Sequence, residues 1–260
     1  MKPLFLGIGL FFLVTNLFAQ TKPVPPKNLH LYLLAGQSNM AGRGEVEAQD
    51  RQAHPRVWVL NQEGEWMPAI DPLHFDKPAV VGVGPGYSFG KAMAEADTTV
   101  AIGLIPVAVG GSAISAWQPG GFHKQTKSYP YDDALRRLKT ALPAGTLRGI
   151  LWHQGESDSK PELAAVYEEK LVELIGRFRQ EAGGETPVVV GTLGDFHVVK
   201  NPVAAQINSI LRNLPKRVPR VACAEATGLT DGGDQTHFGA ASARELGRRY
   251  AEAIQKVKPK

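Results

Sequence analysis

The sequence Leu29-His-Leu-Tyr-Leu-Leu-Ala-Gly-Gln-Ser-Asn-Met-Ala-Gly-Arg-Gly44 decides how the rest of the chain is interpreted. Its apolar run, residues 29–35, is short and sharply bounded, which predicts a buried parallel strand. Gly36 ends this run, and Ser38 follows between the polar residues Gln37 and Asn39. Reactive groups of open α/β sheets lie just beyond the carboxyl ends of strands. Ser38 therefore stands where a nucleophile is expected, although an isolated Gly-x-Ser-Asn is more often a simple turn.

A second polar motif, Asp231-Gly-Gly-Asp-Gln-Thr-His-Phe238, lies near the other end of the chain. A serine hydroxyl needs a base within hydrogen-bond reach, usually a histidine whose second nitrogen is held by a carboxylate. His237, with Asp234 three residues before it, supplies both groups. Taken alone, the motif predicts a capped helix N-terminus with a surface histidine. Taken together with Ser38, it indicates a catalytic pair.

Two further motifs lie between these, Val109-Gly-Gly-Ser-Ala-Ile-Ser-Ala-Trp117 and Trp152-His-Gln-Gly-Glu-Ser-Asp158. With Gly36–Met40 and Asp234–His237 they form four blocks that resemble the SGNH hydrolase superfamily. Within it, they resemble the carbohydrate esterase family 6 and sialate O-acetylesterase-like group. The blocks come in the family's order over about 200 residues.

The resemblance implies roles for the motif residues. Ser38 would be the nucleophile, His237 the general base and Asp234 the carboxylate that orients it, with Glu156 as the alternative or additional carboxylate. The oxyanion would be held by the backbone N–H groups of Ser38 and Gly111. Gln154 would add its side chain, in the place of the asparagine found in other members of the superfamily.

Four more residues are candidates for substrate binding: Gln37, Asn39, Trp117 and His153. Trp117 fits a sugar-stacking role and a core position equally well. His153 and Glu156 are three apart, but no further ligand of matching type is clustered with them, so no metal is expected. The glycine-rich stretch Val81–Gly90 lacks the spacing of a nucleotide fingerprint and contains Pro85, so it predicts close helix packing and no cofactor.

The expected activity, implied by the resemblance, is removal of O-acetyl groups from a carbohydrate. We expect an acetylated polysaccharide such as acetylxylan, because the chain is a single compact domain. The alternatives are a sialate O-acetylesterase, a lipase or thioesterase of the same superfamily, and a non-catalytic carbohydrate-binding protein on the same fold.

The chain of 260 residues is long enough for one sizeable domain, and 43% hydrophobic and 21% charged residues are ordinary for a globular protein. The net charge of +4 is scattered, which argues against nucleic acid as a partner. Residues 1–19 resemble a secretory signal peptide, residues 20–28 a proline-rich linker, and residues 29–260 form the esterase-type domain. The mature protein is expected to be secreted or periplasmic, away from the membrane. The single cysteine, Cys223, excludes an internal disulfide.

The strand, loop and helix pattern repeats about five times and predicts a three-layer α/β/α sandwich with a mainly parallel five-stranded sheet. By resemblance, the fold would be SGNH-type and flavodoxin-like. The loop 61–76 predicts either a pocket wall or a flap over the sheet edge. Strands are expected at 29–35, 56–60, 100–109, 147–152 and 187–193, with a short last strand at 221–224. Helices are expected at 84–97, 132–142, 162–181, 202–214 and 240–257.

Overall fold

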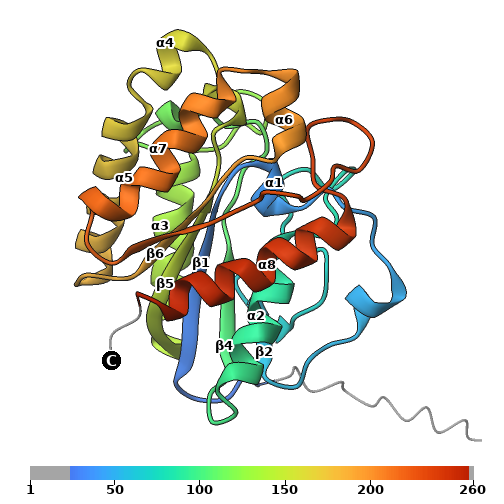
Figure 1. Ribbon diagram of the computed structural model, residues 1–260. Coiled ribbons are helices and arrows are strands. Elements are labelled where there is room, and N and C mark those ends of the chain that lie inside the picture. Colours follow the sequence, from blue (N-terminus) through green and yellow to red (C-terminus); the bar gives the residue numbers. More distant parts are fainter. Residues whose placement is uncertain (1–23, 258–260) are drawn as a thin grey trace, which may run out of the picture.

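The computed structural model describes residues 24–257, which form one seven-stranded sheet between two layers of helices (Figure 1). The strand order is β3-β2-β4-β1-β5-β6-β7. All neighbouring strands are parallel except the β2–β3 pair. The strands are β1 (Leu29–Gly36), β2 (Val57–Leu60), β3 (Trp66–Pro68), β4 (Ile102–Pro106), β5 (Gly145–His153), β6 (Val188–Gly191) and β7 (Val221–Ala224).

Strand β1 lies at the centre of the sheet, paired with β4 on one side and β5 on the other. Its side chains alternate between the two faces: Leu31 and Leu33 join one core cluster, and Tyr32 and Leu34 join the other. Burial of both faces explains the continuous apolar run in its sequence. After β1 the chain builds one side of the sheet and later the other, so the carboxyl end of β1 is a topological switch point, where such folds place their ligands.

The helices form two layers, one on each face of the sheet, as Figure 1 shows. Helices α2 (Pro85–Ala96) and α8 (Ala240–Gln255) contribute Tyr87, Leu246 and neighbouring residues to the cluster on one face. Helices α3 (Pro130–Ala141), α5 (Tyr167–Ala182) and α7 (Ala204–Arg217) pack on the other face. The shorter helices are α1 (Ser38–Ala41), α4 (Pro161–Ala164) and α6 (Asp195–Lys200). Single 3₁₀ turns occur at η1 (Ala48–Arg51), η2 (Ile114–Ala116), η3 (Leu142–Ala144) and η4 (Glu156–Asp158).

The prediction of an α/β/α sandwich with a mainly parallel sheet is confirmed, but the prediction of five strands is wrong. The six apolar segments expected from sequence all form strands, and β3 adds a seventh. This strand pairs antiparallel with β2 at the sheet edge, with Trp58 opposite Pro68. Its three residues are half-buried or exposed, and a segment this short does not stand out as a strand in the sequence. The 61–76 loop is thus partly an edge strand.

The single helix expected at 162–181 is also wrong, because the chain leaves the helical conformation at Val166, where φ is −112° and ψ is 2°. The side chain of Val166 is exposed, whereas that of Tyr167 is fully buried. The Tyr167 hydroxyl donates to the carbonyl of Gln154 at 2.8 Å and accepts from Trp152 Nε1 at 3.2 Å. The break therefore lets the helix turn its tyrosine toward the end of β5.

The leader expected at residues 1–19 and the first part of the expected linker, residues 20–23, lie outside the described residues. Between residues 24 and 257, no helix combines the length and the apolar character required to cross a membrane.

Candidate active site

Ser38 is the first residue of α1, directly beyond the carboxyl end of β1. The turn into α1 depends on Gly36, whose φ is +127°. A Cβ atom at this position would lie 2.1 Å from the carbonyl oxygen of His153, so a larger residue does not fit. The N–H of Gln37 donates to the same oxygen at 2.9 Å. Strand β5 thus holds the turn that presents Ser38, which lines an open cleft.

His237 lies in the loop between β7 and α8 and reaches Ser38 across the cleft. Its Nε2 is 3.0 Å from Ser38 Oγ, and its Nδ1 is 2.6 Å from Asp234 Oδ2. Asp234 Oδ1 also accepts the backbone N–H groups of Thr236 and His237, each at 2.8 Å. Burial alone would raise the pKa of Asp234, but these hydrogen bonds to His237 and Thr236 lower it below its usual value. Asp234 is therefore a stable anion that sets both the loop backbone and the imidazole.

Glu156, the alternative carboxylate, does not contact His237. Its Oε1 accepts from Asn39 Nδ2 at 2.5 Å, and its Oε2 is buried without a partner among the described residues. Burial raises the pKa of Glu156 to about 7, although the hydrogen bond from Asn39 opposes the shift. Of the two carboxylates proposed from sequence, the structure brings Asp234 to the imidazole and leaves Glu156 at the wall of the cleft.

Asn39 was expected to bind substrate, but in the structure its amide makes hydrogen bonds within the protein. Besides Glu156, Nδ2 donates to the carbonyl of Thr236 at 3.0 Å, and Oδ1 accepts the N–H of Phe238 at 3.1 Å. These two contacts lie on either side of His237. Asn39 thus joins the Ser38 turn to the His237 loop, 199 residues further along the chain.

Two glycines after β4 border the cleft beside Ser38. Gly111 has φ +82°, a conformation in which a side chain is strained. The N–H of Gly110 donates to Asp76 Oδ2 at 2.8 Å, and the same oxygen forms an ion pair with Arg43 at 2.8 Å. Within the described residues, the N–H groups of Ser38 and Gly111 donate to no backbone carbonyl. Both remain available to an anionic oxygen in the cleft.

Gln154 was expected to complete this set of donors, but in the structure its amide is directed into the protein. Its side chain is fully buried, and Nε2 donates to Gln37 Oε1 at 3.2 Å, to Ser112 O at 3.1 Å and to Asp158 Oδ2. The carboxylate of Asp158 holds the amide inside the protein. Gln37 lies between Gln154 and the cleft and borders it. Its Oε1 is occupied, and its Nε2 makes no hydrogen bond within residues 24–257.

Trp117 and His153, also expected to bind substrate, are fully buried away from the cleft. Trp117 packs edge-on against Trp152, with ring centroids 5.1 Å apart, and donates through Nε1 to Ser112 Oγ at 2.9 Å. His153 Nδ1 lies 3.0 Å from the Tyr250 hydroxyl, and burial lowers the pKa of His153 to about 3. Both residues therefore belong to the protein core.

The cleft has a volume of about 620 Å³ and includes residues without a strong sequence signal. Arg43 and Lys77 add positive charge to its wall. His197, from α6, is 8% exposed, and neither ring nitrogen has a partner among the described residues. Burial lowers the pKa of His197, so its ring is neutral at physiological pH. The only sequence signal for His197 is its place just after β6, where sheet-edge loops converge.

The similarity of this chain to known proteins extends over almost its whole length. A family model described as "Carbohydrate esterase, sialic acid-specific acetylesterase" matches residues 28–256. The probable carbohydrate esterase At4g34215 of Arabidopsis thaliana is 31% identical over 255 residues, covering 89% of this chain and 91% of the relative. Human sialate O-acetylesterase is 30% identical over 165 residues, which is 49% of this chain and 31% of that protein.

Solved structures agree on the fold. The structure of the Arabidopsis protein superposes with a TM-score of 0.78 at 26% identity, covering 89% of this chain and 99% of that one. NanS gives a TM-score of 0.70 at 19% identity, covering 90% and 98% of the two chains. A carbohydrate acetylesterase of Xanthomonas citri gives 0.67 at 22% identity, covering 88% and 56%.

Proposed function

The chain belongs to the carbohydrate esterase family of sialic acid-specific acetylesterases, and from this premise we propose that it is a serine O-acetylesterase acting through Ser38, His237 and Asp234. The observation that carries the proposal is the continuous hydrogen-bond chain from Ser38 Oγ through His237 to Asp234, at 3.0 and 2.6 Å. These distances are those of a nucleophile, a general base and its orienting carboxylate.

In the first half of the proposed reaction, Ser38 Oγ attacks the acetyl carbonyl while its proton moves to His237 Nε2. Asp234 accepts a hydrogen bond from Nδ1–H of His237, which leaves Nε2 free as the base and stabilises the imidazolium that forms. The tetrahedral intermediate then collapses, and His237 returns the proton to the leaving sugar hydroxyl. In the second half, His237 deprotonates a water molecule that hydrolyses the acetyl-serine and releases acetate.

The negative oxygen of the intermediate requires donors that are already in place. We assign this role to the N–H groups of Ser38 and Gly111, as expected from sequence, and to the side chain of Gln37 in place of Gln154. The support for Gln37 is that it borders the cleft with an unengaged Nε2, whereas Gln154 is enclosed. Gln37→Ala is expected to lower kcat by about 10²-fold, the loss typical of one oxyanion donor. An unchanged kcat would exclude Gln37 from this role.

The proposed substrate is an acetylated polysaccharide such as acetylxylan, and a sialate ester is the second candidate, supported by the likeness to sialate O-acetylesterase over about half of the chain. Acetate release from acetylated xylan, acetylated glucomannan and acetylated sialosides separates these substrates. Ser38→Ala is expected to abolish release from every active substrate. Equal rates for wild type and Ser38→Ala would leave only the non-catalytic binding function. A preference for long acyl chains would indicate a lipase or thioesterase.

Export is part of the proposal, supported by Lys2 followed by the apolar run that begins at Leu4 and by the small residue Ala19. Sequencing the amino terminus of the mature protein tests it, with Gln20 as the expected first residue.

A further inference from the structure

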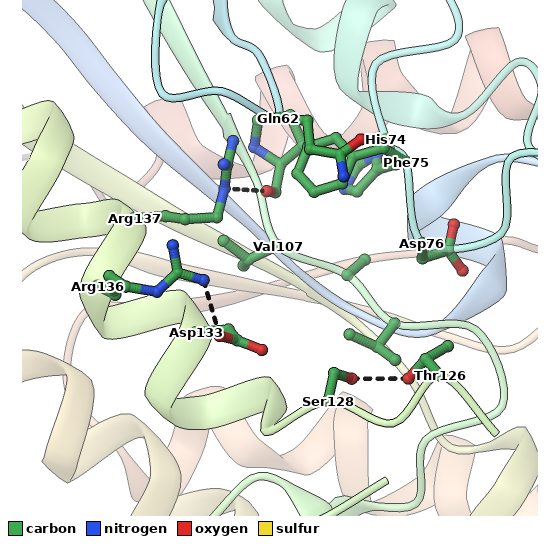
Figure 2. A pocket seen from close by; sticks show the side chains of 13 residues that line it. Gln62, His74, Phe75, Asp76, Val107, Thr126, Ser128, Asp133, Arg136 and Arg137 are labelled. Carbon is green, nitrogen blue, oxygen red and sulfur yellow. Dashed lines mark hydrogen bonds and ion pairs between the residues drawn. The ribbon is translucent and has the colours of Figure 1, made fainter. Parts of the chain in front are cut away.

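A second cavity, separate from the Ser38 cleft, lies beyond the carboxyl ends of β2 and β4 and has a volume of about 360 Å³ (Figure 2). Helix α3 forms one wall with Asp133, Arg136 and Arg137. The segment containing Thr126 and Ser128 forms another wall. The volume lies in the range of pockets that hold small molecules.

The ion pairs around this cavity do not include Arg137. Arg136 is paired with Asp133 at 2.7 Å, and Asp76 is paired with Arg43 at 2.8 Å. Burial lowers the pKa of His74 to about 4, so this ring is neutral at physiological pH. Arg137 is 5% exposed, and no carboxylate within the described residues forms an ion pair with it. The carboxylates of Asp133 and Glu63 act on Arg137 only at a distance, so its guanidinium has no direct anionic partner among the described residues.

The guanidinium of Arg137 is held in place by uncharged groups. Its Nε donates to the carbonyl of Pro106 at 3.0 Å, and its Nη2 donates to the carbonyls of Leu60 and Asn61 at 2.6 and 3.0 Å. Its Cζ lies 4.6 Å from the centre of the Phe75 ring. Nη1 makes no hydrogen bond within residues 24–257. Burial lowers the pKa of Arg137 to about 10, which still leaves it charged at neutral pH. A fixed arginine with a free nitrogen suits a carboxylate.

The rest of the lining suits a sugar ring. Thr126 Oγ1 and Ser128 Oγ lie 2.6 Å apart and offer hydroxyl partners, as Figure 2 shows. Gln62 adds an amide, and Val107 and Val109 supply an apolar surface for C–H groups. A mixture of apolar wall and a few placed polar groups is typical of small-molecule sites.

The cavity and the Ser38 cleft share a wall. Asp76 borders the cavity, and its Oδ2 binds Arg43 and the N–H of Gly110, both of which border the cleft. Lys77, at the cleft, donates to Gln125 Oε1 at 2.9 Å, next to Thr126 in the cavity. An oligosaccharide with its ester at Ser38 thus has a neighbouring pocket for another unit.

We propose that this cavity is a subsite for a carboxylate-bearing sugar unit, a uronic or sialic acid, that flanks the acetylated unit and is bound by Arg137. The inference rests on the proposed esterase function, because only then does the flanking unit belong to a substrate. It adds a requirement for acidic carbohydrate that the catalytic residues do not impose.

Binding of sugars without an ester tests the subsite independently of catalysis. The probes are methyl glucuronide, methyl glucoside as its neutral match, and the methyl glycoside of N-acetylneuraminic acid, titrated calorimetrically against the full chain. We expect at least one acidic sugar to bind about tenfold more tightly than the glucoside, as one charge-assisted hydrogen bond implies. Whichever acid binds more tightly identifies the source of the carboxylate.

Three variants test whether the acidic sugar binds in this cavity. Arg137→Gln is expected to remove the preference for acid. Ser128→Trp fills the cavity but leaves the carbonyl contacts of Arg137 intact, so it serves if Arg137→Gln does not fold. Arg248→Gln, on the distant helix α8 with a side chain 55% exposed, is the matched loss of charge and is expected to keep the preference.

Equal binding of the acidic and neutral sugars by wild type overturns the proposal, and so does a preference that survives Ser128→Trp. Acetate release by the same preparations reports the esterase separately. Acid-selective binding without acetate release would contradict the esterase and leave the subsite standing.

Discussion

At the scale of single residues, the structure distinguishes Asp234 from Glu156, the two carboxylates that the sequence offered for orienting His237. Asp234 Oδ2 lies 2.6 Å from His237 Nδ1, whereas Glu156 Oε1 accepts a hydrogen bond from Asn39 Nδ2 at 2.5 Å. Asp234 also holds two backbone N–H groups of its own loop, so replacing its carboxylate alters both the imidazole and the loop. Glu156 reaches His237 only through Asn39 and the loop that Asn39 anchors.

We expect Asp234→Asn to lower kcat by at least about 10²-fold, because the amide no longer fixes the correct imidazole tautomer. The effect should stay below the roughly 10⁴-fold loss seen when a buried aspartate is replaced, since Asp234 is 52% exposed and water partly substitutes for it. Glu156→Gln retains an oxygen acceptor for Asn39 and should change kcat by less than about tenfold. Steady-state kinetics on an acetyl ester measure both variants, and a larger loss in Glu156→Gln would reverse the assignment.

Glu156 also makes the stability of the protein depend on pH. Burial raises the pKa of Glu156 in the folded state to about 7 from an ordinary value of 4.5. Between these values the unfolded chain has released the proton and the folded chain has kept it, so stability falls as pH rises from 4.5 to 7. Relative to Glu156→Gln, we expect wild type to lose about 1–3 kcal/mol of unfolding free energy over this window. Urea titrations of both proteins at pH 4.5 and pH 7 measure this loss. An equal change of unfolding free energy in wild type and Glu156→Gln would contradict the prediction.

At the scale of elements, the contact between α2 and α8 covers one face of the sheet and holds the end of the His237 loop. Gly247 of α8 lies directly against the amino-terminal turn of α2: a Cβ atom there would be 2.3 Å from the carbonyl oxygen of Pro85 and 2.9 Å from the nitrogen of Phe89. Backbone atoms cannot move aside as a flexible side chain can. The two helices therefore approach this closely only with glycine at position 247.

We expect Gly247→Ala to reduce the unfolding free energy by about 1–3 kcal/mol, the cost of overpacking a core. The matched control is Gly176→Ala in α5, an exposed position where an added Cβ meets nothing within 4 Å. That change should stabilise by about 0.4–1 kcal/mol, because alanine restricts the unfolded chain. Chemical denaturation compares the two variants, and a similar gain in both would show that the helices separate without cost.

At the scale of the whole molecule, the last helix is fastened to the first third of the chain by Arg244. Its Nε and Nη2 donate to the two carboxylate oxygens of Asp50, at 2.8 and 2.7 Å, and Asp50 is 1% exposed. Burial would raise the pKa of Asp50, but the hydrogen bonds from Arg244 bring it below its usual value. The contact links residues 194 positions apart and fixes α8 over the edge of the fold.

We expect Arg244→Met to cost about 2–4 kcal/mol at pH 7, because it leaves the Asp50 carboxylate buried and unpaired. The stabilising contribution of this pair is present above the unfolded pKa of Asp50 and is lost as pH falls through the folded value. The difference from wild type should therefore shrink below pH 4. Arg248→Met, which removes an exposed pair on the same helix, should cost less than about 1 kcal/mol. Equal losses at pH 7 and pH 3 would contradict an ionic origin.

The layered α/β fold, six of the seven strands and the motifs that meet at the carboxyl edge of the sheet could all be predicted from the amino-acid sequence. Burial of both sheet faces imposes local apolar runs, and strand ends carry reactive groups to one edge, so both features can be predicted from neighbouring residues. The spacing of Asp234 and His237 likewise lies within one loop and was visible without coordinates.

Which polar side chains face the cleft could not be predicted from the sequence, because it depends on contacts in the folded protein. Gln154 turns inward because Asp158, Ser112 and Gln37 accept its amide, and Asn39 turns aside because Glu156, Thr236 and Phe238 engage its own. Trp117 lies in the core because Trp152 packs against it. The direction of a loop side chain depends on partners far away in the chain, and no local pattern records them. The lack of a direct ion pair at Arg137 within the described residues is of the same kind, since it depends on Asp133 pairing with Arg136 and Asp76 pairing with Arg43.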